Sequence, residues 1–197
     1  MTKVKAIFLD RDGVVNELVY FQEQGIIDSP FTPEQFHLCP GVPQAIRRFQ
    51  NAGYKTIIIS NQPGVAKGHM TLNNFNRIDE TMRALLGKEG ILLDGVYYCL
   101  HHPEGIIEQY RIDCKCRKPK PGLILKAAKD MDIDVSRSWF IGDNLTDIKA
   151  GKNAGCHTLL FGKMRCELCN LMHNEGINPE AIKLNLLEAA DFIIKGA

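Results

Sequence analysis

Residues 4–16 (VKAIFLDRDGVVN) constrain the fold more strongly than any other stretch of the chain. Residues 6–9 form an unbroken apolar run that ends abruptly at the sequence Asp-Arg-Asp-Gly of residues 10–13. A run this short, closed by charge and glycine, predicts a strand buried on both faces of a parallel sheet. Because open α/β sheets bind ligands beyond the carboxyl ends of their strands, we expect Asp10 and Asp12 to face such a site. The plain alternative is a strand followed by a solvated acidic turn.

The rest of the chain alternates apolar strands with amphipathic helices. We predict strands at 54–59, 95–99, 138–141 and 157–161, and helices at 43–52, 72–85, 121–131 and 145–154. Toward the C-terminus we predict a helix over 179–189, followed by an edge strand or a helical continuation over 191–195. This order of elements predicts a doubly wound parallel α/β sheet in one domain spanning residues 1–197.

Two long segments show little regular periodicity. Residues 17–38 are interrupted by Gly25, Pro30 and Pro33, and we predict an irregular loop there. Residues 100–119 are dense in cysteine, histidine, arginine and lysine. Loops of such length in a compact domain are usually functional or mobile, so both segments are candidates for a role in binding.

Composition excludes several classes of partner. The 197 residues carry a net charge of +1 from 24 basic and 23 acidic side chains, which provides no general attraction to nucleic acid or membranes. No apolar segment approaches the roughly 20 residues of a membrane span, and we expect no secretory signal peptide. We therefore expect a protein that binds neither nucleic acid nor a membrane. We also expect a cytoplasmic monomer, although nothing in the composition sets the oligomeric state. Seven cysteines, several at short spacings, favour metal ligation or free thiols over a disulfide framework.

Four groups of polar residues, three of them just after predicted strands and one in the loop before a predicted helix, are expected to meet at one edge of the sheet. They are Asp10 and Asp12, then Ser60, Asn61 and Gln62, then Arg117 and Lys118, and finally Asp143 and Asp147. Carboxylates held a few ångströms apart repel one another strongly, and a divalent cation relieves that repulsion. Ligands that are all oxygen favour Mg²⁺ over a transition metal.

This set of residues suits phosphoryl transfer. The cation would hold one phosphate oxygen, Lys118 and the Ser60 hydroxyl would hold others, and Asp10 would attack phosphorus in line. Asp12 would then transfer protons, while its main-chain carbonyl completes the Mg²⁺ shell. Simpler interpretations exist for each residue alone: Asp143 and Asp147 as helix N-terminal charges, Ser60 as a turn residue, and Lys118 as a solvated loop charge.

Five stretches resemble motifs of the haloacid dehalogenase (HAD) superfamily of phosphatases. They are DRDGVVN, SNQPGVAKG, YYCLHHPEG, CKCRKPKPG and GDNLTDIKAG, spread over residues 7–155. Within the superfamily, the chain is most similar to the group of histidinol-phosphate phosphatases and D-glycero-D-manno-heptose 1,7-bisphosphate 7-phosphatases. The resemblance implies a Rossmann-like fold without a large cap domain. It also implies Mg²⁺-dependent hydrolysis of a small phosphorylated substrate through an aspartyl phosphate.

The resemblance further implies a role for each matching residue. Asp10 corresponds to the nucleophile and Asp12 to the general acid and base, with Mg²⁺ on Asp10, the Asp12 carbonyl and Asp143. Ser60 and Lys118 would steady the phosphoryl group. The expected substrate-binding residues are Asn61, Gln62, Arg117 and Lys118.

Two pairs of residues with alternate spacing suggest a second metal site. Cys99 and His101, and likewise Cys114 and Cys116, point the same way in an extended chain and can grip one ion. Three thiolates and one imidazole form a closed tetrahedral Zn²⁺ set, which is structural. The spacing alone leaves free thiols equally open, and similarity to the group's zinc loop favours the metal. His102 is the rival ligand, although an exposed loop histidine is the simpler interpretation.

Other features leave alternatives open. Cys166, Cys169 and His173 lack a fourth ligand, so free thiols are the favoured interpretation. Asn144 stands where the group often has a lysine, and the 17–38 loop is longer than usual, so histidinol phosphate or another small sugar phosphate remains an alternative substrate. A zinc-stabilised binding module without turnover is the non-enzymatic alternative. A phosphatase acting on nucleic-acid ends lacks the expected basic patch.

Overall fold

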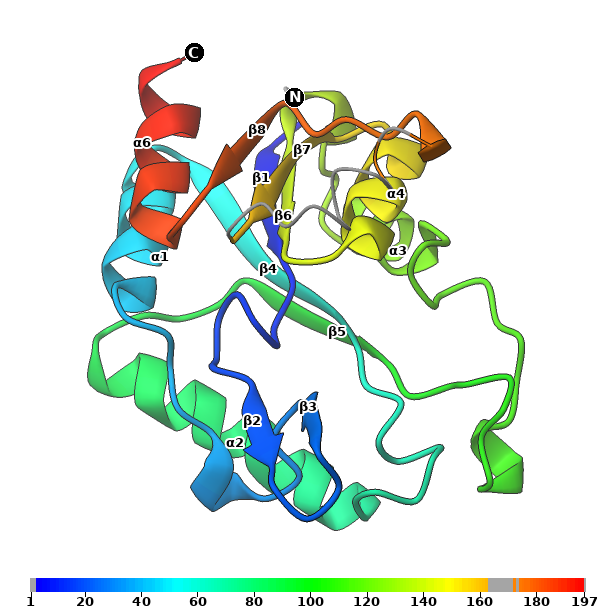
Figure 1. Cartoon of the computed structure of the whole chain (residues 1–197). Coiled ribbons are helices and arrows are strands. Elements are labelled where there is room, and N and C mark those ends of the chain that lie inside the picture. The colour runs from blue at the N-terminus through cyan, green and yellow to red at the C-terminus, as the bar shows by residue number, and fades with distance from the viewer. Residues whose placement is uncertain (1–2, 163–171, 173, 197) are drawn as a thin grey trace.

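The computed structural model describes residues 3–162, 172 and 174–196. Its centre is a six-stranded, all-parallel sheet in the order β5-β4-β1-β6-β7-β8 (Figure 1). The strands are β1 (Lys5–Leu9), β4 (Tyr54–Asn61), β5 (Gly95–Cys99), β6 (Trp139–Gly142), β7 (His157–Phe161) and β8 (Ala181–Lys183). The order reverses beside β1, so its carboxyl end lies at the switch point where such sheets bind ligands.

Within the described residues, five α-helices cover the two faces of this sheet. They are α1 (Val42–Asn51), α2 (Leu72–Lys88), α3 (Gly122–Asp130), α4 (Leu145–Ala154) and α6 (Leu186–Lys195). Apolar residues of α1, α2 and α6 pack with one face of the central strands, whereas those of α3 and α4 pack with the opposite face. The doubly wound α/β fold predicted from the sequence is confirmed.

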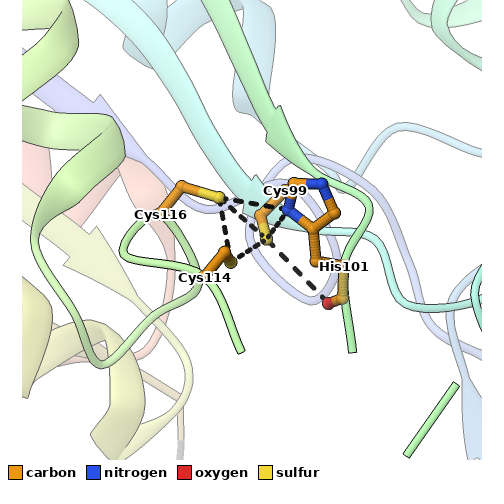
Figure 2. A group of neighbouring side chains, drawn as sticks. All are labelled: Cys99, His101, Cys114 and Cys116. Carbon is orange, nitrogen blue, oxygen red and sulfur yellow. Dashed lines mark hydrogen bonds between the residues drawn. The ribbon is translucent and has the colours of Figure 1, made fainter. Parts of the chain in front are cut away.

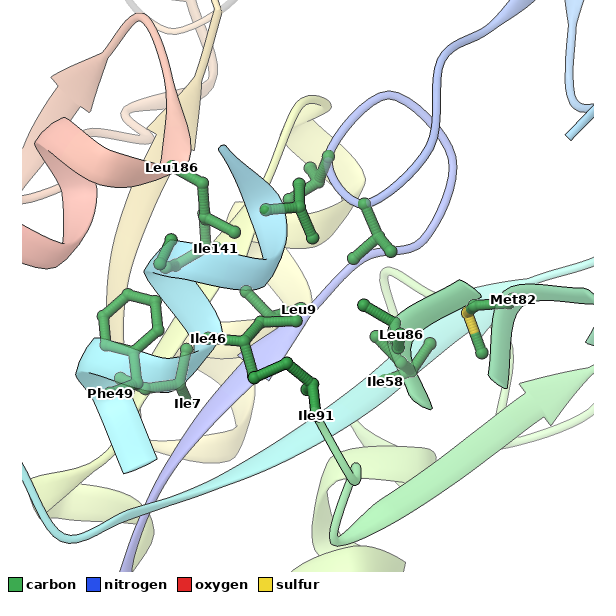
Figure 3. Packing of buried hydrophobic residues seen from close by; sticks show 14 of the residues in the cluster. Ile7, Leu9, Ile46, Phe49, Ile58, Met82, Leu86, Ile91, Ile141 and Leu186 are labelled. Carbon is green, nitrogen blue, oxygen red and sulfur yellow. The ribbon is translucent and has the colours of Figure 1, made fainter. Parts of the chain in front are cut away.

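Strand β1 shows why the sheet is buried on both sides. Ile7 and Leu9 belong to the larger apolar cluster under α1, α2 and α6 (Figure 3). Ala6 and Phe8 belong to the cluster under α3 and α4. All four side chains are fully buried, because alternate residues of a strand point to opposite faces. Each large aliphatic or aromatic side chain buried here stabilises the fold by about 1.5–3 kcal/mol relative to its exposure.

Most element predictions agree with the structure. The strands at 95–99 and 157–161 and the helix at 145–154 have the predicted bounds. Helix α2 begins after Thr71, whose side chain accepts a hydrogen bond from the Asn74 main-chain N–H. Strand β4 runs two residues beyond its predicted end and carries Ser60 and Asn61 as sheet residues. None of the helices that the structure describes is long and apolar enough to cross a membrane.

The prediction of an irregular loop over residues 17–38 was wrong. The segment contains a two-stranded antiparallel hairpin of β2 (Val19–Phe21) and β3 (Ile26–Asp28), and a 3-10 helix, η1 (Pro33–Gln35). Gly25 adopts φ +63° in the turn between the strands, a conformation that glycine reaches without strain. Short strands with half-exposed side chains have weak periodicity, which is why the sequence pattern did not reveal them.

The predicted helix over 179–189 was also wrong. Residues 181–183 form edge strand β8, which pairs with β7, and the helix begins only at Leu186. The Asn185 side chain accepts a hydrogen bond from the Glu188 main-chain N–H and so starts the helix there. Residues 191–195 belong to α6, so the helical continuation is correct and the edge strand at these positions is not.

Candidate active site

The carboxyl ends of β1 and β6 bring Asp10 and Asp143 together. The Asp10 main-chain N–H donates to the Ile141 carbonyl at 3.0 Å, which joins the end of β1 to β6. The chain then turns at Gly13, which has φ +82°. A Cβ atom at Gly13 would lie 2.1 Å from Oδ2 of Asp143, so only glycine permits this approach.

Three carboxylates form a tight cluster at this edge. One oxygen from each of Asp10, Asp143 and Asp147 lies within 4.8 Å of the others. Burial, followed by repulsion from Asp10 and Asp147, raises the pKa of Asp143 to about 8. Burial likewise raises the pKa of Asp147 to about 6, although Lys118 opposes that shift. The cluster holds more negative charge than its protein neighbours neutralise.

Lys118 is the cation inside this cluster. Its ammonium lies 2.8 Å from Oδ1 of Asp10 and 2.7 Å from Oδ1 of Asp147, and it donates to the Ile59 carbonyl at 3.0 Å. Burial opposes its charge, but Asp10 and Asp147 outweigh burial and hold its pKa above the ordinary value. Asp147 therefore holds Lys118 in place, a contact that the sequence pattern did not predict.

The Asp12 side chain lies outside the carboxylate cluster and contacts a different set of residues. Its carboxylate accepts hydrogen bonds from Arg11, from Nδ2 of Asn16 at 3.1 Å and from Nε2 of Gln62. The Arg11 side chain is fully buried, and its Nη2 also donates to Oε1 of Gln62 at 2.8 Å. Burial opposes the charge of Arg11, but Asp12 outweighs it and raises the pKa of the guanidinium.

Sequence reasoning missed Arg11 as a residue of the site. Its position between Asp10 and Asp12 was visible, but an arginine beside two aspartates is expected to extend into solvent. Its burial depends on Gln62, which lies 51 residues away. No local pattern reports such a partner.

The three polar residues at the end of β4 have separate surroundings. Oγ of Ser60 accepts a hydrogen bond from Nε2 of Gln62 at 3.1 Å. The Asn61 side chain forms two hydrogen bonds with the main chain of Lys118. Ser60 and Gln62 are each 1% exposed, so the protein's own groups satisfy the Gln62 amide and hold it away from solvent.

Arg117 and Asn144 lie at the margin of the cluster. Arg117 is partly exposed and donates from Nη1 to the His101 carbonyl at 3.4 Å, which ties it to the cysteine-rich loop. Asn144 is the N-cap of α4 and forms a capping box with Asp147. Asn144, which stands where the resembling group often has a lysine, therefore has a local structural role at the start of this helix.

Three thiols and one imidazole that could hold a metal ion lie close together: Cys99, His101, Cys114 and Cys116 (Figure 2). The Sγ atom of Cys116 lies 3.0 Å from Cys114, 3.3 Å from Cys99 and 3.4 Å from Nδ1 of His101. Cys99 ends β5, whereas the other cysteines come from the 100–119 segment, whose regular structure is the 3-10 helix η2 (Glu108–Tyr110). We call these four residues the thiol cluster.

The thiol cluster has uneven acidity. Burial raises the pKa of the Cys99 thiol above its ordinary value. Burial also opposes charge on Cys114, but hydrogen bonds from Cys116 and Cys99 outweigh it and lower the pKa of Cys114 to about 6. The rival ligand His102 instead accepts a hydrogen bond from the Glu104 main-chain N–H at Nδ1. Cys166, Cys169 and His173 lie outside the described residues.

Comparison with known proteins identifies relatives with this architecture. Residues 115–189 match the family described as HAD-hydrolase-like. The chain is 41% identical over 152 residues to a D-glycero-beta-D-manno-heptose-1,7-bisphosphate 7-phosphatase of Pasteurella multocida, covering 76% of this chain and 77% of the relative. It is 37% identical over 159 residues to a D-glycero-alpha-D-manno-heptose-1,7-bisphosphate 7-phosphatase of Burkholderia mallei, covering 81% of this chain and 80% of the relative.

A solved structure extends this similarity to the whole fold. The chain superposes on D,D-heptose 1,7-bisphosphate phosphatase from B. bronchiseptica, complexed with magnesium and phosphate, with a TM-score of 0.78. The two chains are 30% identical, and the match covers 98% of this chain and 99% of the other.

Proposed function

The chain belongs to the haloacid dehalogenase superfamily of phosphatases, and we propose that it removes the 7-phosphate of D-glycero-D-manno-heptose 1,7-bisphosphate with the help of Mg²⁺. The observation that supports this most directly is the buried contact of Lys118 with both Asp10 and Asp147, beside Asp143. An ammonium and a cation-binding carboxylate cluster at one sheet edge suit a dianionic phosphoryl group.

Asp10 is the proposed nucleophile. A carboxylate oxygen of Asp10 forms a bond to phosphorus while the bond between phosphorus and the sugar oxygen breaks, which gives an aspartyl phosphate and an alcohol. Lys118 and the Ser60 hydroxyl hold the non-bridging oxygens during this transfer. Water then attacks phosphorus, breaks the bond to Asp10 and releases inorganic phosphate.

Asp12 is the proposed general acid and base. It gives a proton to the leaving sugar oxygen in the first step and takes one from the attacking water in the second, so it ends the cycle as it began. Asn16 and Gln62, which donate hydrogen bonds to its carboxylate, hold the side chain still. Arg117 and Asn61 are proposed to contribute to the substrate site, Asn61 through its grip on Lys118.

The carboxylate cluster has the chemistry of a Mg²⁺ site. We propose that Asp10, the Asp12 main-chain carbonyl and Asp143 hold the ion, since hard oxygen ligands suit it. The raised pKa of Asp143 fits this assignment, because it reflects burial of the carboxyl and, after that, repulsion from Asp10 and Asp147, both of which a bound cation would offset. Bound there, Mg²⁺ supplies the positive charge that lets phosphate and carboxylates lie side by side.

The thiol cluster has the donor set of a structural Zn²⁺ site. Three sulfur atoms and Nδ1 of His101 already lie within 4.8 Å of one another, and a Cys₃His set leaves no open position. We therefore propose that Zn²⁺ bound by Cys99, His101, Cys114 and Cys116 orders the 100–119 segment and takes no part in the chemistry.

We also propose a setting for this activity. The polypeptide acts as one HAD-like domain over residues 1–197, as a cytoplasmic monomer, on a small sugar phosphate and without nucleic-acid or membrane partners. Histidinol phosphate is the second candidate substrate, because Asn144 replaces the lysine common in the resembling group and the β2–β3 hairpin enlarges the 17–38 segment. One relative is named for the beta anomer of the heptose bisphosphate and another for the alpha anomer, so both anomers are candidate substrates.

The test is steady-state phosphate release with Mg²⁺ present. Substrates would be both anomers of the heptose bisphosphate, histidinol phosphate and a set of sugar monophosphates. We expect the highest kcat/KM for a heptose bisphosphate. A preference for histidinol phosphate would replace the substrate assignment, and no turnover of any substrate would favour a zinc-stabilised binding module.

A further inference from the structure

Four polar side chains beneath the proposed phosphate site form one connected network. Arg11 donates to Asp12 and Gln62, and Gln62 in turn donates to Asp12 and Ser60. We propose that Gln62, held by Arg11, is a positioning residue that fixes the Ser60 hydroxyl and the Asp12 carboxylate for phosphoryl transfer. This inference rests on the proposed phosphatase function, and it differs from the substrate contact predicted for Gln62 from the sequence.

Arg11 determines which way the Gln62 amide faces. A guanidinium has donors only, so the group 2.8 Å from Nη2 of Arg11 must be the amide oxygen of Gln62. The amide nitrogen therefore lies on the other side, where it meets Oδ2 of Asp12 and Oγ of Ser60. In the reverse orientation the Gln62 amide N–H would face the guanidinium N–H of Arg11, and the Gln62 amide oxygen would face the Asp12 carboxylate. Both contacts would leave buried polar groups without a hydrogen bond, which is costly in free energy.

The orientation of Gln62 determines what Ser60 can do. A hydroxyl has one proton and two lone pairs, and Oγ of Ser60 uses a lone pair to accept from Nε2 of Gln62 at 3.1 Å. Among the residues that the structure describes, Gln62 is the only hydrogen-bond partner of the Ser60 hydroxyl. Its proton therefore stays free to donate to a phosphoryl oxygen, which is the role proposed for Ser60.

Asp12 is restrained by the same two residues. Nε and Nη2 of Arg11 lie 3.1 and 3.0 Å from Oδ1, and Nε2 of Gln62 reaches Oδ2, so both carboxylate oxygens have donors. A planar guanidinium grips a carboxylate and an amide oxygen together, whereas an ammonium offers one point of charge. This double contact is the reason for a fully buried arginine at this position. Its Nη1 has no hydrogen-bond partner among the residues that the structure describes.

The first test replaces Gln62 with Met, which has similar length but no donor or acceptor. We expect Gln62→Met to lower kcat for phosphate release by about 10- to 100-fold, while KM changes less than about threefold. This loss is smaller than the roughly 10²–10³-fold lost with one donor that contacts the reacting group, because Gln62 acts through Ser60 and Asp12. Gln50→Met is the matched control, because Gln50 donates to Thr56 and Leu92 far from the site, and it should keep wild-type kcat.

A double-mutant cycle separates positioning from a general structural effect. In a Ser60→Ala background, the loss caused by Gln62→Met should shrink by about fivefold or more, because the two residues act as a unit. Gln62→Glu keeps an acceptor for Arg11 but has no donor for Ser60, and should lose at least as much kcat. It provides the same test if Gln62→Met does not fold, as judged from thermal melting.

The outcomes distinguish this inference from the proposed function. Wild-type protein without phosphatase activity would refute the proposed function. Active wild-type protein, with folded Gln62→Met or Gln62→Glu that retains kcat within about twofold, would refute the positioning role alone. Equal losses in the wild-type and Ser60→Ala backgrounds would also refute it.

Discussion

The side chain of Asn61 and the main chain of Lys118 are joined by two hydrogen bonds: Nδ2 donates to the Lys118 carbonyl at 3.1 Å, and Oδ1 accepts from its N–H at 3.0 Å. The pair links the end of β4 to the segment that carries the thiol cluster, two residues after Cys116. Lys118 is therefore placed from two directions, by the central sheet and by the loop. Its ammonium can meet Asp10 only when both are in position.

Loss of one of the proposed zinc ligands should disturb catalysis through this connection. Ordering an irregular loop costs about 1–2 kcal/mol per residue, whereas structural Zn²⁺ supplies ~10–16 kcal/mol in small peptides. We expect Cys114→Ser to release zinc, expose residues 100–119 to proteolysis and lower phosphate release by about tenfold or more, with the central sheet folded. Metal content, proteolysis and turnover should be measured on one sample.

Cys156→Ala is the control for this experiment, because Cys156 lies in the apolar cluster under α3 and α4 and belongs to neither group of possible metal ligands found among the described residues. It should keep its zinc and its loop protection. The coupling between loop and active site is wrong if native protein holds no zinc, or if zinc leaves without changing turnover.

Asp10→Asn should abolish phosphate release. The amide oxygen is a poor nucleophile, and the substitution also removes one charge from the proposed Mg²⁺ site. The measurement is phosphate release at saturating Mg²⁺, together with thermal melting to show that the variant is folded. Turnover by folded Asp10→Asn would exclude an aspartyl-phosphate mechanism.

Asp12→Asn should slow turnover by a factor on the order of 10² or more, because proton transfer to the leaving oxygen is lost. The aspartyl phosphate should form most readily from substrates with good leaving groups, so an aryl phosphate should be affected less than a sugar phosphate. Single-turnover rates for both substrates provide the comparison. A change confined to KM would indicate that Asp12 serves only in binding.

The raised pKa of Asp143 predicts a pH-dependent stability of the Mg²⁺-free protein. The folded state keeps a proton on this carboxyl up to about pH 8, whereas an ordinary aspartate loses it near 3.8. Between these values the folded state binds more protons, so stability conferred by the protonated group is lost as pH rises toward 8. We expect the Tm without Mg²⁺ to fall by several degrees from pH 5 to pH 8.

Asp143→Asn carries no titratable group at this position, so its Tm should vary less over the same range. Saturating Mg²⁺ should flatten the wild-type profile, because the ion favours the ionised carboxylate. Equal slopes for wild type and Asp143→Asn would show that this carboxyl is not the group responsible.

Local patterns were sufficient to locate most of the sheet. Short apolar runs closed by charge or glycine marked β1, β6 and β7, because strands buried on both faces need continuous apolar sequence. The same patterns brought Asp10, Lys118 and Asp143 to one edge. The β2–β3 hairpin and β8 escaped prediction because their side chains are half-exposed, and half-exposed strands leave little periodic signal.

By itself, the sequence determined the parallel α/β sheet and the strand ends from which the acidic residues project, because these follow from burial and chain direction, which are local properties. Spacing left the four residues of the thiol cluster open between metal ligands and free thiols, and the family resemblance favoured the metal. Only the tertiary structure decided that Arg11 is buried, that Gln62 faces Asp12 and Ser60, and that Asp147 holds Lys118. Each of these depends on a hydrogen bond or ion pair between residues far apart in the chain, which exists only once the sheet has assembled.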